Sequence, residues 1–455
     1  MNLLLLIILV IAEISFCVLQ LGGTVRKKEW TPRRLTVNLI EVCIYLITLL
    51  LPGIDFGFRF TALFLILCAR VVVSGIFFLV HRRNDKIKQK SAIVWSAVIS
   101  VVLIAFSLVP AFLFSDYHGR PATGQYEVSE RNVILIDRSR TEEYEKDGSS
   151  REVPVHFYYP ENGKEIEAHS LPLVIFSHGA FGYYQSNTST YMELASNGYV
   201  VASLDHPYHA FFTKDSSGKT IIVDIPFLRT AMYVGNSGEI TEEEIFEITS
   251  KWMELREADM NFVIDTIKAS ASDASFDDSW CFPNFPEEEI AGITGLIDPD
   301  RIGLIGHSLG GATAVTVGRR DDVLAAVDLD GTMLGEETGV ENGKVRINDQ
   351  PYTTPLLSLD SESHHNSRIE AEETGYVYSN NVILDQDPEG YSTYFKGAAH
   401  MNFTDLPLFA PALARMLGTG SIDPEACIDQ VNALVLQFFD CYLKGTGTFT
   451  VNDSY

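Results

Sequence analysis

The residues of this sequence best suited to chemistry are a serine and its glycine neighbours. The segment G-H-S-L-G occupies residues 306–310, directly after a short apolar run at residues 301–305 and before a stretch typical of a helix start. A sharp turn from strand to helix requires small flanking residues, and it lifts its serine above the edge of a sheet. The pattern alone arises by chance roughly 0.2 times in a chain of this length. Ser308 is therefore a candidate nucleophile that the surrounding sequence must support.

A serine nucleophile needs a histidine as base and an acid that orients the histidine. His400 lies just after the last apolar run and before the final helical stretch, so that it can reach back over the turn at Ser308. Asp330 and Asp360 each end an apolar run that follows the serine, and geometry alone does not decide between them. Either acid gives the chain order Ser, acid, His. Asp328, two residues before one candidate, is expected in a buried structural hydrogen-bond network.

The other histidines near these motifs are less suited to act as the base. His307 adjoins the candidate nucleophile but points the wrong way to serve it. His364 and His365 form a polar pair that we expect on a loop, without a strand to aim them. His400 thus remains the candidate base.

Two backbone N–H groups are expected to stabilise the oxyanion that forms during ester or amide hydrolysis. One belongs to Leu309, directly after the serine. The other belongs to Ala180, in the segment F-S-H-G-A-F-G at residues 176–182, where Gly179 lets the backbone turn after an early strand. Each such donor typically lowers the barrier by ~3 kcal/mol.

The segments that must position these residues alternate between short β-rich apolar runs and stretches of helical length. This alternation predicts an α/β fold with a mostly parallel sheet, helices on both faces and sites at the carboxyl ends of the strands. We assign residues 125–455 to this catalytic domain, with a candidate cap inserted at 207–284. The predicted strands are residues 153–159, 173–176, 199–204, 301–305, 324–329, 355–359 and 391–395. The predicted helices include residues 187–196, 241–269, 309–317 and 424–443.

Residues 1–115 read as a transmembrane anchor of about four helices. Each apolar stretch there is about long enough to cross a bilayer core of ~30 Å. Basic residues gather between the first and second stretches and between the third and fourth, and such loops stay in the cytoplasm. The sequence therefore predicts a multi-pass protein of the cell membrane with an extracytoplasmic catalytic domain. The four stretches are residues 3–21, 35–51, 61–80 and 92–114.

Charge is divided unevenly between these parts. Residues 1–115 hold 12 Lys and Arg against 5 Asp and Glu, whereas the remainder holds 22 against 55. The acidic remainder excludes nucleic acid as an expected partner, because it would repel phosphates. Glu13, Glu41 and Arg70 lie inside the apolar stretches, where charges are costly. We expect interhelical pairing, such as Arg70 with Glu41, rather than an ion or substrate path.

No metal and no cofactor is predicted. Histidines and cysteines lack the spacing of a metal site, and the glutamate runs at 242–244 and 287–289 lack the alternating oxygens of a calcium loop. Cys281, Cys427 and Cys441 are enough for one disulfide and a remaining thiol.

Four segments together resemble the plasma-type (group VII) platelet-activating factor acetylhydrolases and their bacterial relatives. The resemblance covers roughly residues 125–445 and implies an α/β-hydrolase fold. In that family the acid follows shortly after the nucleophile, which corresponds to Asp330, and the oxyanion donors correspond to Ala180 and Leu309. The segments are F-S-H-G at 176–179, A-S-L-D-H at 202–206, G-H-S-L-G-G at 306–311 and G-A-A-H-M-N-F-T-D at 397–405.

This resemblance implies a calcium-independent serine esterase that removes short or oxidised acyl chains from phospholipids through an acyl-enzyme. An ester or phospholipid substrate and the lipid bilayer would be its partners. The membrane anchor and the acidic insertion depart from the secreted enzymes, and they leave the substrate open. A general carboxylesterase or lipase, a peptidase or thioesterase, and a catalytically inactive membrane sensor remain the alternatives.

Overall fold

The computed structural model describes residues 2–51, 54, 57–161, 166–236, 240–273 and 275–455. These residues form two compact units. The N-terminal unit comprises the chain up to His118 together with Leu408–Ala414, and the larger unit comprises Gly119–Pro407 and Arg415–Tyr455. Each unit has its own core.

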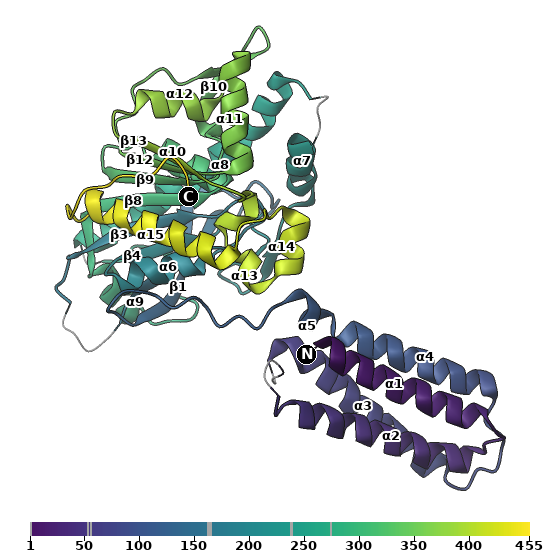
Figure 1. The fold of residues 1–455 in the computed structure, drawn as a ribbon. Helices are drawn as coiled ribbons and strands as arrows, with labels where there is room; N and C mark the ends of the chain where they lie inside the picture. Colours follow the sequence, from purple (N-terminus) through teal and green to yellow (C-terminus); the bar gives the residue numbers. More distant parts are fainter. Residues whose placement is uncertain (1, 52–53, 55–56, 162–165, 237–239, 274) are drawn as a thin grey trace. The chain divides into compact units, whose positions relative to one another are not determined.

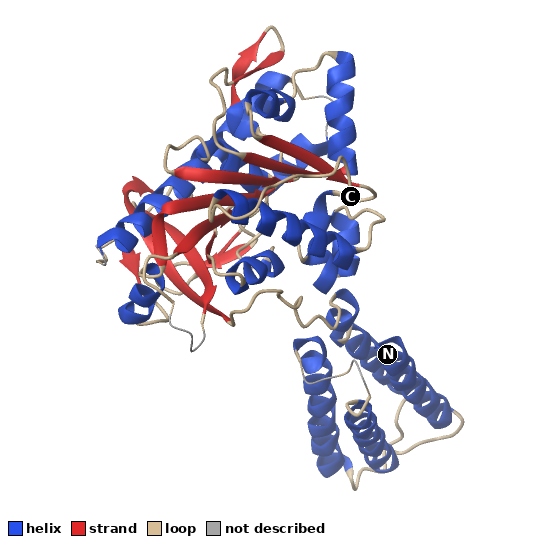
Figure 2. Cartoon of the chain, turned by 60° about the vertical axis from the view of Figure 1, so that its left-hand side comes forward, coloured by secondary structure: helices blue, strands red, loops and turns tan. Residues whose placement is uncertain are grey.

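The larger unit is built on one twisted sheet of nine described strands, drawn as red arrows in Figure 2. The order is β13-β12-β9-β8-β3-β4-β2-β1-β7; the first six run parallel, and β2, β1 and β7 each run antiparallel to the strand before them in this order. The strands are β1 (Val128–Thr141), β2 (Ser150–Pro160), β3 (Leu171–Ser177), β4 (Val200–Leu204), β7 (Trp280–Cys281), β8 (Ile297–His307), β9 (Val323–Leu329), β12 (Leu356–Ser361) and β13 (Gly390–Phe395).

Helices cover both faces of this sheet, as predicted (Figure 1). Successive residues of β3 point to opposite faces, so Leu173 and Ile175 pack in one core cluster while Val174 and Phe176 pack in the other. The first cluster includes residues of α8 (Glu242–Asp273), α9 (Glu287–Thr294) and α10 (Leu309–Val317). The second includes residues of α6 (Thr188–Ser196) and α15 (Pro424–Tyr442).

The seven predicted strands all occur, but β1 was not predicted. This strand lies next to the sheet edge, and its burial is partial and irregular along its length. Polar residues make up most of both its ends, but its centre, residues 133–136, is a short apolar run that the sequence analysis passed over. Smaller elements of this unit are the hairpin of β5 (Phe212–Lys214) and β6 (Thr220–Ile222), α7 (Ile225–Asn236), the hairpin of β10 (Glu337–Glu341) and β11 (Lys344–Ile347), α11 (Glu362–Thr374) and α12 (Ser379–Gln386). Two short helices, α13 (Leu406–Phe409) and α14 (Pro411–Leu417), each belong partly to the N-terminal unit.

Helix α8 is part of the core over its second half. Met260, Val263, Ile264 and Ile267 are fully buried in the first cluster, beneath the sheet. The first half of the helix is more open, with Glu243, Glu244, Glu247 and Glu254 exposed. A cap role thus stays a prediction for α7 and the start of α8, whereas the rest of the helix supports the sheet.

The N-terminal unit contains four long helices and the short α5 (Val109–Leu113). Among the described residues, three helices are long and apolar enough to cross a membrane by length and composition, where the sequence predicted about four. The remaining long helix, α2 (Lys27–Thr48), begins eight residues before the predicted stretch 35–51, so its first turns contain charged residues. The long helices are α1 (Asn2–Leu21), α2 (Lys27–Thr48), α3 (Phe58–His81) and α4 (Lys90–Ser107).

Buried ion pairs join these helices. Glu13 of α1 accepts two hydrogen bonds from Arg34 of α2, at 2.7 and 2.8 Å, and a further one from Arg70 of α3. Arg70 also pairs with Glu41 at 2.8 Å, which confirms the predicted partner. The charges inside the helices therefore compensate one another within this unit. All six cysteines of the chain, each in the described part, are free, so the disulfide that the sequence allowed is absent.

Candidate active site

Ser308 lies in the sharp turn between β8 and α10. Its backbone has φ 56° and ψ −124°, a strained conformation for a residue with a side chain. Glycines make this turn possible: a Cβ on Gly306 would lie 2.1 Å from the Gly310 carbonyl, and one on Gly310 would lie 1.9 Å from the Ser177 carbonyl oxygen. The G-x-S-x-G pattern is therefore required by backbone contacts.

Asp330 and His400 meet beside this turn. His400 Nδ1 donates to Asp330 Oδ2 at 2.8 Å, and Ser361 N donates to the other carboxylate oxygen at 2.6 Å. Asp330 follows β9 with φ 56° and is buried. Burial opposes its ionisation, but hydrogen bonds from His364 and His400 outweigh this effect and hold the pKa of Asp330 well below its usual range. The carboxylate is charged and fixed in direction.

The two alternative aspartates have other partners. Asp360 accepts hydrogen bonds from Arg368, at 2.5 Å, and from Ser358, at 2.9 Å. Asp328 is fully buried, and its Oδ1 accepts from Gly331 N at 2.9 Å, which confirms the expected structural role. The geometry thus favours Asp330 as the acid next to His400.

Ser308 and His400 line the same cavity, of about 300 Å³. The His400 side chain is 44% exposed and so is accessible from the cavity, whereas its partner carboxylate is covered. Four further hydroxyl-bearing side chains contribute to the wall: Thr332, Ser361, Ser363 and Ser367.

The loop after β3 packs directly against the serine. A Cβ on Gly179 would lie 3.1 Å from Ser308 Cβ and 2.8 Å from His307 Nδ1. Within the described residues, the backbone N–H groups of Ala180 and Leu309 have no hydrogen-bond partner. Two unoccupied donors therefore lie on segments that meet at the serine, as an oxyanion site requires.

Helix α8 holds this loop in position. The fully buried Arg256 donates from Nη1 to the His178 carbonyl at 2.6 Å and from Nη2 to the Gly179 carbonyl at 3.3 Å. Three residues further on, Asp259 accepts from His206 Nδ1 at 3.0 Å. The insertion thus contributes side chains that shape the site from below, a role that the sequence did not indicate.

His364 is a site residue that the sequence analysis missed. The expectation of a loop is wrong: Ser361 ends β12 and caps α11 by accepting from His364 N at 3.1 Å. His364 Nδ1 then donates to Asp330 Oδ1 at 3.2 Å. Burial opposes protonation of the ring, but Asp330 and Asp360 outweigh it and raise the pKa of His364 to about 9. The signal in the sequence was Ser361, a serine after an apolar run that can cap a helix containing His364.

His307 does not act on the serine, in line with its expected direction. Its Nε2 donates to the His400 carbonyl at 3.1 Å, so that the ring supports the loop carrying the candidate base. Burial and the nearby His400 lower the pKa of His307 to about 3. The neutral ring can make this single hydrogen bond.

Asp330, Asp360 and His364 also lie close enough to one another to ligate a metal ion, although their spacing in the sequence did not suggest it. Each is already engaged, and the Arg368 guanidinium, 2.5 Å from Asp360, supplies a positive charge that would repel a cation. We therefore interpret the cluster as an ion-pair network.

Comparisons with known proteins identify the family of this chain. The model of the family "Platelet-activating factor acetylhydrolase, isoform II" matches residues 149–454. The chain belongs to this family. The platelet-activating factor acetylhydrolase of Cavia porcellus is 25% identical over 288 residues, and that of Bos taurus is 23% identical over 301 residues. Each match covers 60% of this chain and 57% of the relative, so the chain spans little more than half of these relatives' length.

A solved structure shows the same fold. Ferulic acid esterase from Streptomyces cinnamoneus superposes with a TM-score of 0.50 and 20% sequence identity, over 72% of this chain and 93% of the esterase. The member of the acetylhydrolase family described here therefore has the α/β-hydrolase fold that its sequence predicted.

Gly310→Ala should destabilise the fold by more than ~3 kcal/mol, because the new Cβ would overlap the Ser177 carbonyl. Gly292→Ala in α9 is the matched control: its Cβ meets nothing within 4 Å, and we expect stabilisation by ~0.5 kcal/mol. Unfolding of the full-length chain in detergent measures both. Equal stability of Gly310→Ala and the wild type would contradict the close contact.

The stabilisation that His364 provides should depend on pH. Its pKa rises from 6.5 to about 9 on folding, so the protonated ring stabilises the fold fully below about pH 6.5 and loses this effect as pH rises through about 9. His364→Gln removes the titrating group, so the Tm difference from the wild type should shrink over this range. His365→Gln, on the same helix, is the control. A constant difference would exclude a contribution from protonation.

Proposed function

We propose that this chain is a serine ester hydrolase in which Ser308, His400 and Asp330 form the catalytic triad. The observation that carries the proposal is the 2.8 Å hydrogen bond between His400 Nδ1 and Asp330 in a cavity that Ser308 also lines. Membership of the acetylhydrolase family supports ester hydrolysis as the reaction.

In the proposed mechanism, Ser308 Oγ attacks the acyl carbonyl while His400 Nε2 takes the hydroxyl proton. Asp330 keeps the other ring nitrogen protonated and stabilises the imidazolium. The oxyanion accepts hydrogen bonds from the N–H groups of Ala180 and Leu309. The tetrahedral intermediate then collapses: the bond between the acyl carbon and the leaving oxygen breaks, and His400 gives its proton to that oxygen. The alcohol departs and the acyl group stays on Ser308 Oγ as the acyl-enzyme. A water molecule then attacks the acyl-enzyme with His400 as the base, and the carboxylic acid leaves Ser308.

The cavity supports a short acyl group on a polar alcohol as the substrate. At about 300 Å³ it is at the lower limit for small-molecule sites and leaves little room for a long chain. The hydroxyls of Ser361, Ser363 and Ser367 on its wall suit a leaving group rich in hydrogen-bonding atoms. A phospholipid with a short sn-2 acyl chain combines a short acyl group with a polar leaving group.

We further propose that the N-terminal unit is a four-span membrane anchor with the catalytic unit outside the cytoplasm. Helix α2 is too polar to qualify as a span by composition, but Arg34 pairs with Glu13 of α1, so its charge is compensated inside the bundle. The basic loops around residues 26–34 and 82–90 would then face the cytoplasm.

Substitutions at the site test the triad. Ser308→Ala should abolish turnover of short-chain p-nitrophenyl esters and of a short sn-2-acyl phospholipid. Asp330→Asn should lower kcat by about 10⁴-fold, because the histidine loses its tautomer. Asp360→Asn, one strand away, is the matched control with a small expected effect. A larger loss in Asp360→Asn would overturn the acid assignment.

The substrate panel also separates the remaining alternatives. Turnover of the simple ester alone would indicate a general carboxylesterase. A folded chain that turns over neither ester and resists labelling by a fluorophosphonate would indicate an inactive membrane sensor.

Labelling of introduced cysteines tests the orientation. Ser217 lies exposed in the turn between β5 and β6, and Lys86 lies exposed between α3 and α4. A membrane-impermeant maleimide added to intact cells should label Ser217→Cys but not Lys86→Cys, with the wild type as background. The reverse pattern would place the catalytic unit inside.

A further inference from the structure

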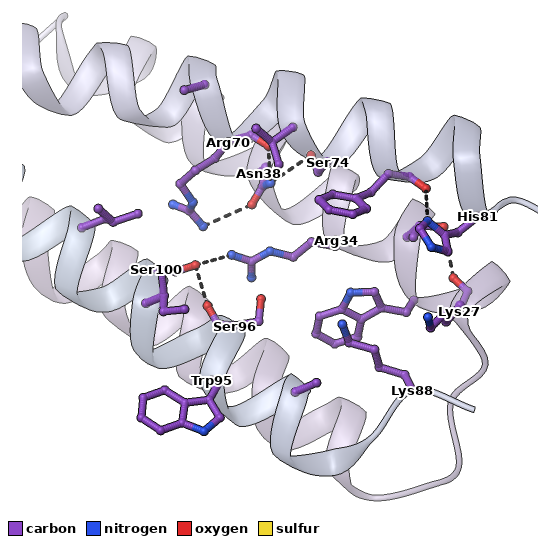
Figure 3. A pocket seen from close by; sticks show the side chains of 18 of the residues that line it. Lys27, Arg34, Asn38, Arg70, Ser74, His81, Lys88, Trp95, Ser96 and Ser100 are labelled. Carbon is purple, nitrogen blue, oxygen red and sulfur yellow. Dashed lines mark hydrogen bonds between the residues drawn. The ribbon is translucent and has the colours of Figure 1, made fainter. Parts of the chain in front are cut away.

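The N-terminal unit contains a cavity of about 800 Å³ between α2, α3 and α4. Figure 3 shows Lys27, Lys88 and His81 toward one end of it, and Arg34, Arg70 and Ser100 toward the other. This volume is in the range of sites that enclose a drug-sized molecule. The cavity is far larger than the one beside Ser308 and has no part in the proposed hydrolysis.

The charged side chains on its wall are all basic. Lys27, Arg34, Arg70 and Lys88 line the cavity, and none of the described lining residues is a carboxylate. The two arginines are already compensated by Glu13 and Glu41, which do not line the cavity. The remaining positive charge belongs to the two lysines.

The fold holds these two lysines together. Lys27 N donates to the Lys86 carbonyl at 2.9 Å, and Lys88 N donates to the Val25 carbonyl at 2.8 Å, so the two segments pair like short strands. Asp85, the acid of this connection, pairs with Arg26 and Lys28 instead. Neither Lys27 nor Lys88 has an ion-pair partner in the described part of the chain.

Without a ligand, the ammonium groups of Lys27 and Lys88 repel each other. Lys88 is half-buried, with its ammonium 5.3 Å from the Trp30 ring. Burial and the neighbouring Lys27 ammonium lower the pKa of Lys88. An anion between the two ammonium groups would relieve their repulsion.

The rest of the cavity is suited to hydrocarbon. Val73 and Phe77 of α3 and Trp95, Ile99 and Leu103 of α4 line it, and most of its surface is apolar. A free phosphate would fill only the basic end. An occupant with an anionic head and an apolar tail would satisfy both ends at once.

We propose that this cavity binds one anionic phospholipid, with its phosphate between Lys27 and Lys88 and its acyl chains against α3 and α4. A choline head group would bring a third cation to the two lysines, whereas a glycerol head group would not. The inference rests on the proposed membrane insertion and is independent of the esterase reaction.

Native mass spectrometry of the full-length chain in detergent tests the site. The probes are phosphatidylglycerol and phosphatidylcholine with the same acyl chains, and sn-glycerol 3-phosphate as the head group alone. The wild type should retain one phosphatidylglycerol and release the other two at the same concentration. The double substitution Lys27→Gln and Lys88→Gln should weaken this binding by about tenfold or more.

The matched control is the double substitution Arg82→Gln and Arg83→Gln, which removes the same charge from exposed residues outside the cavity. It should change binding by less than about twofold. Equal losses in both double variants would indicate non-specific attraction to basic loops and overturn the site. Equal retention of phosphatidylcholine, or equal binding of the head group alone, would also overturn it.

Two further measurements separate this inference from the proposed function. If alkaline carbonate releases the chain from membranes, the chain is not inserted in the bilayer, and both the proposed anchor and the proposed lipid site are wrong. Retention in the membrane without selective lipid binding would overturn the lipid site alone. Hydrolysis of p-nitrophenyl esters should be unchanged in the lysine variant, because both lysines lie outside the unit that contains Ser308.

Discussion

The contact between the start of α10 and the end of β3 is the constraint on which the candidate site depends. The helix approaches so closely that Gly310 packs on the Ser177 carbonyl and Gly311 packs on the Asp328 carboxylate. No side chain fits at either position. Because of this approach, Ser308, the loop after β3 and the turn after β9 converge at one end of the sheet. A longer turn between β8 and α10 would separate Ser308 from Asp330 and from the N–H groups of Ala180 and Leu309.

Around this contact, buried charges are compensated in pairs or small groups. Asp330 lies between His400 and His364, and Asp259 lies between Arg151 and His206. Removing one partner of such a group leaves an uncompensated charge in a medium of low polarity, which is more costly than never burying the pair. The same rule holds in the N-terminal unit for Glu13. Lys27 and Lys88 depart from it, which is why they point to a ligand.

The sequence by itself determined the parts whose cause is local. Strands covered on both faces must be apolar throughout, so β3, β4, β8 and β9 were readable as runs, and the turn at Ser308 was readable from its glycines. His400 was identifiable as a candidate because it follows β13, the last of the predicted strands. β1 was missed although its centre, residues 133–136, is apolar; the run is short and polar residues flank it on both sides.

Only the tertiary structure decided which distant side chains meet. The arrival of His364 at the Asp330 carboxylate follows from the pairing of Leu329 with Leu359 in neighbouring parallel strands. The hydrogen bond of His400 to Asp330 rather than to Asp360 was likewise visible only in the fold. The closeness of Lys27 to Lys88 follows likewise from the backbone pairing of the segment before α2 with the segment between α3 and α4. Local patterns report burial and turns, but strand register and helix packing are set by the whole core. Contacts between side chains far apart in the chain therefore had to come from the fold.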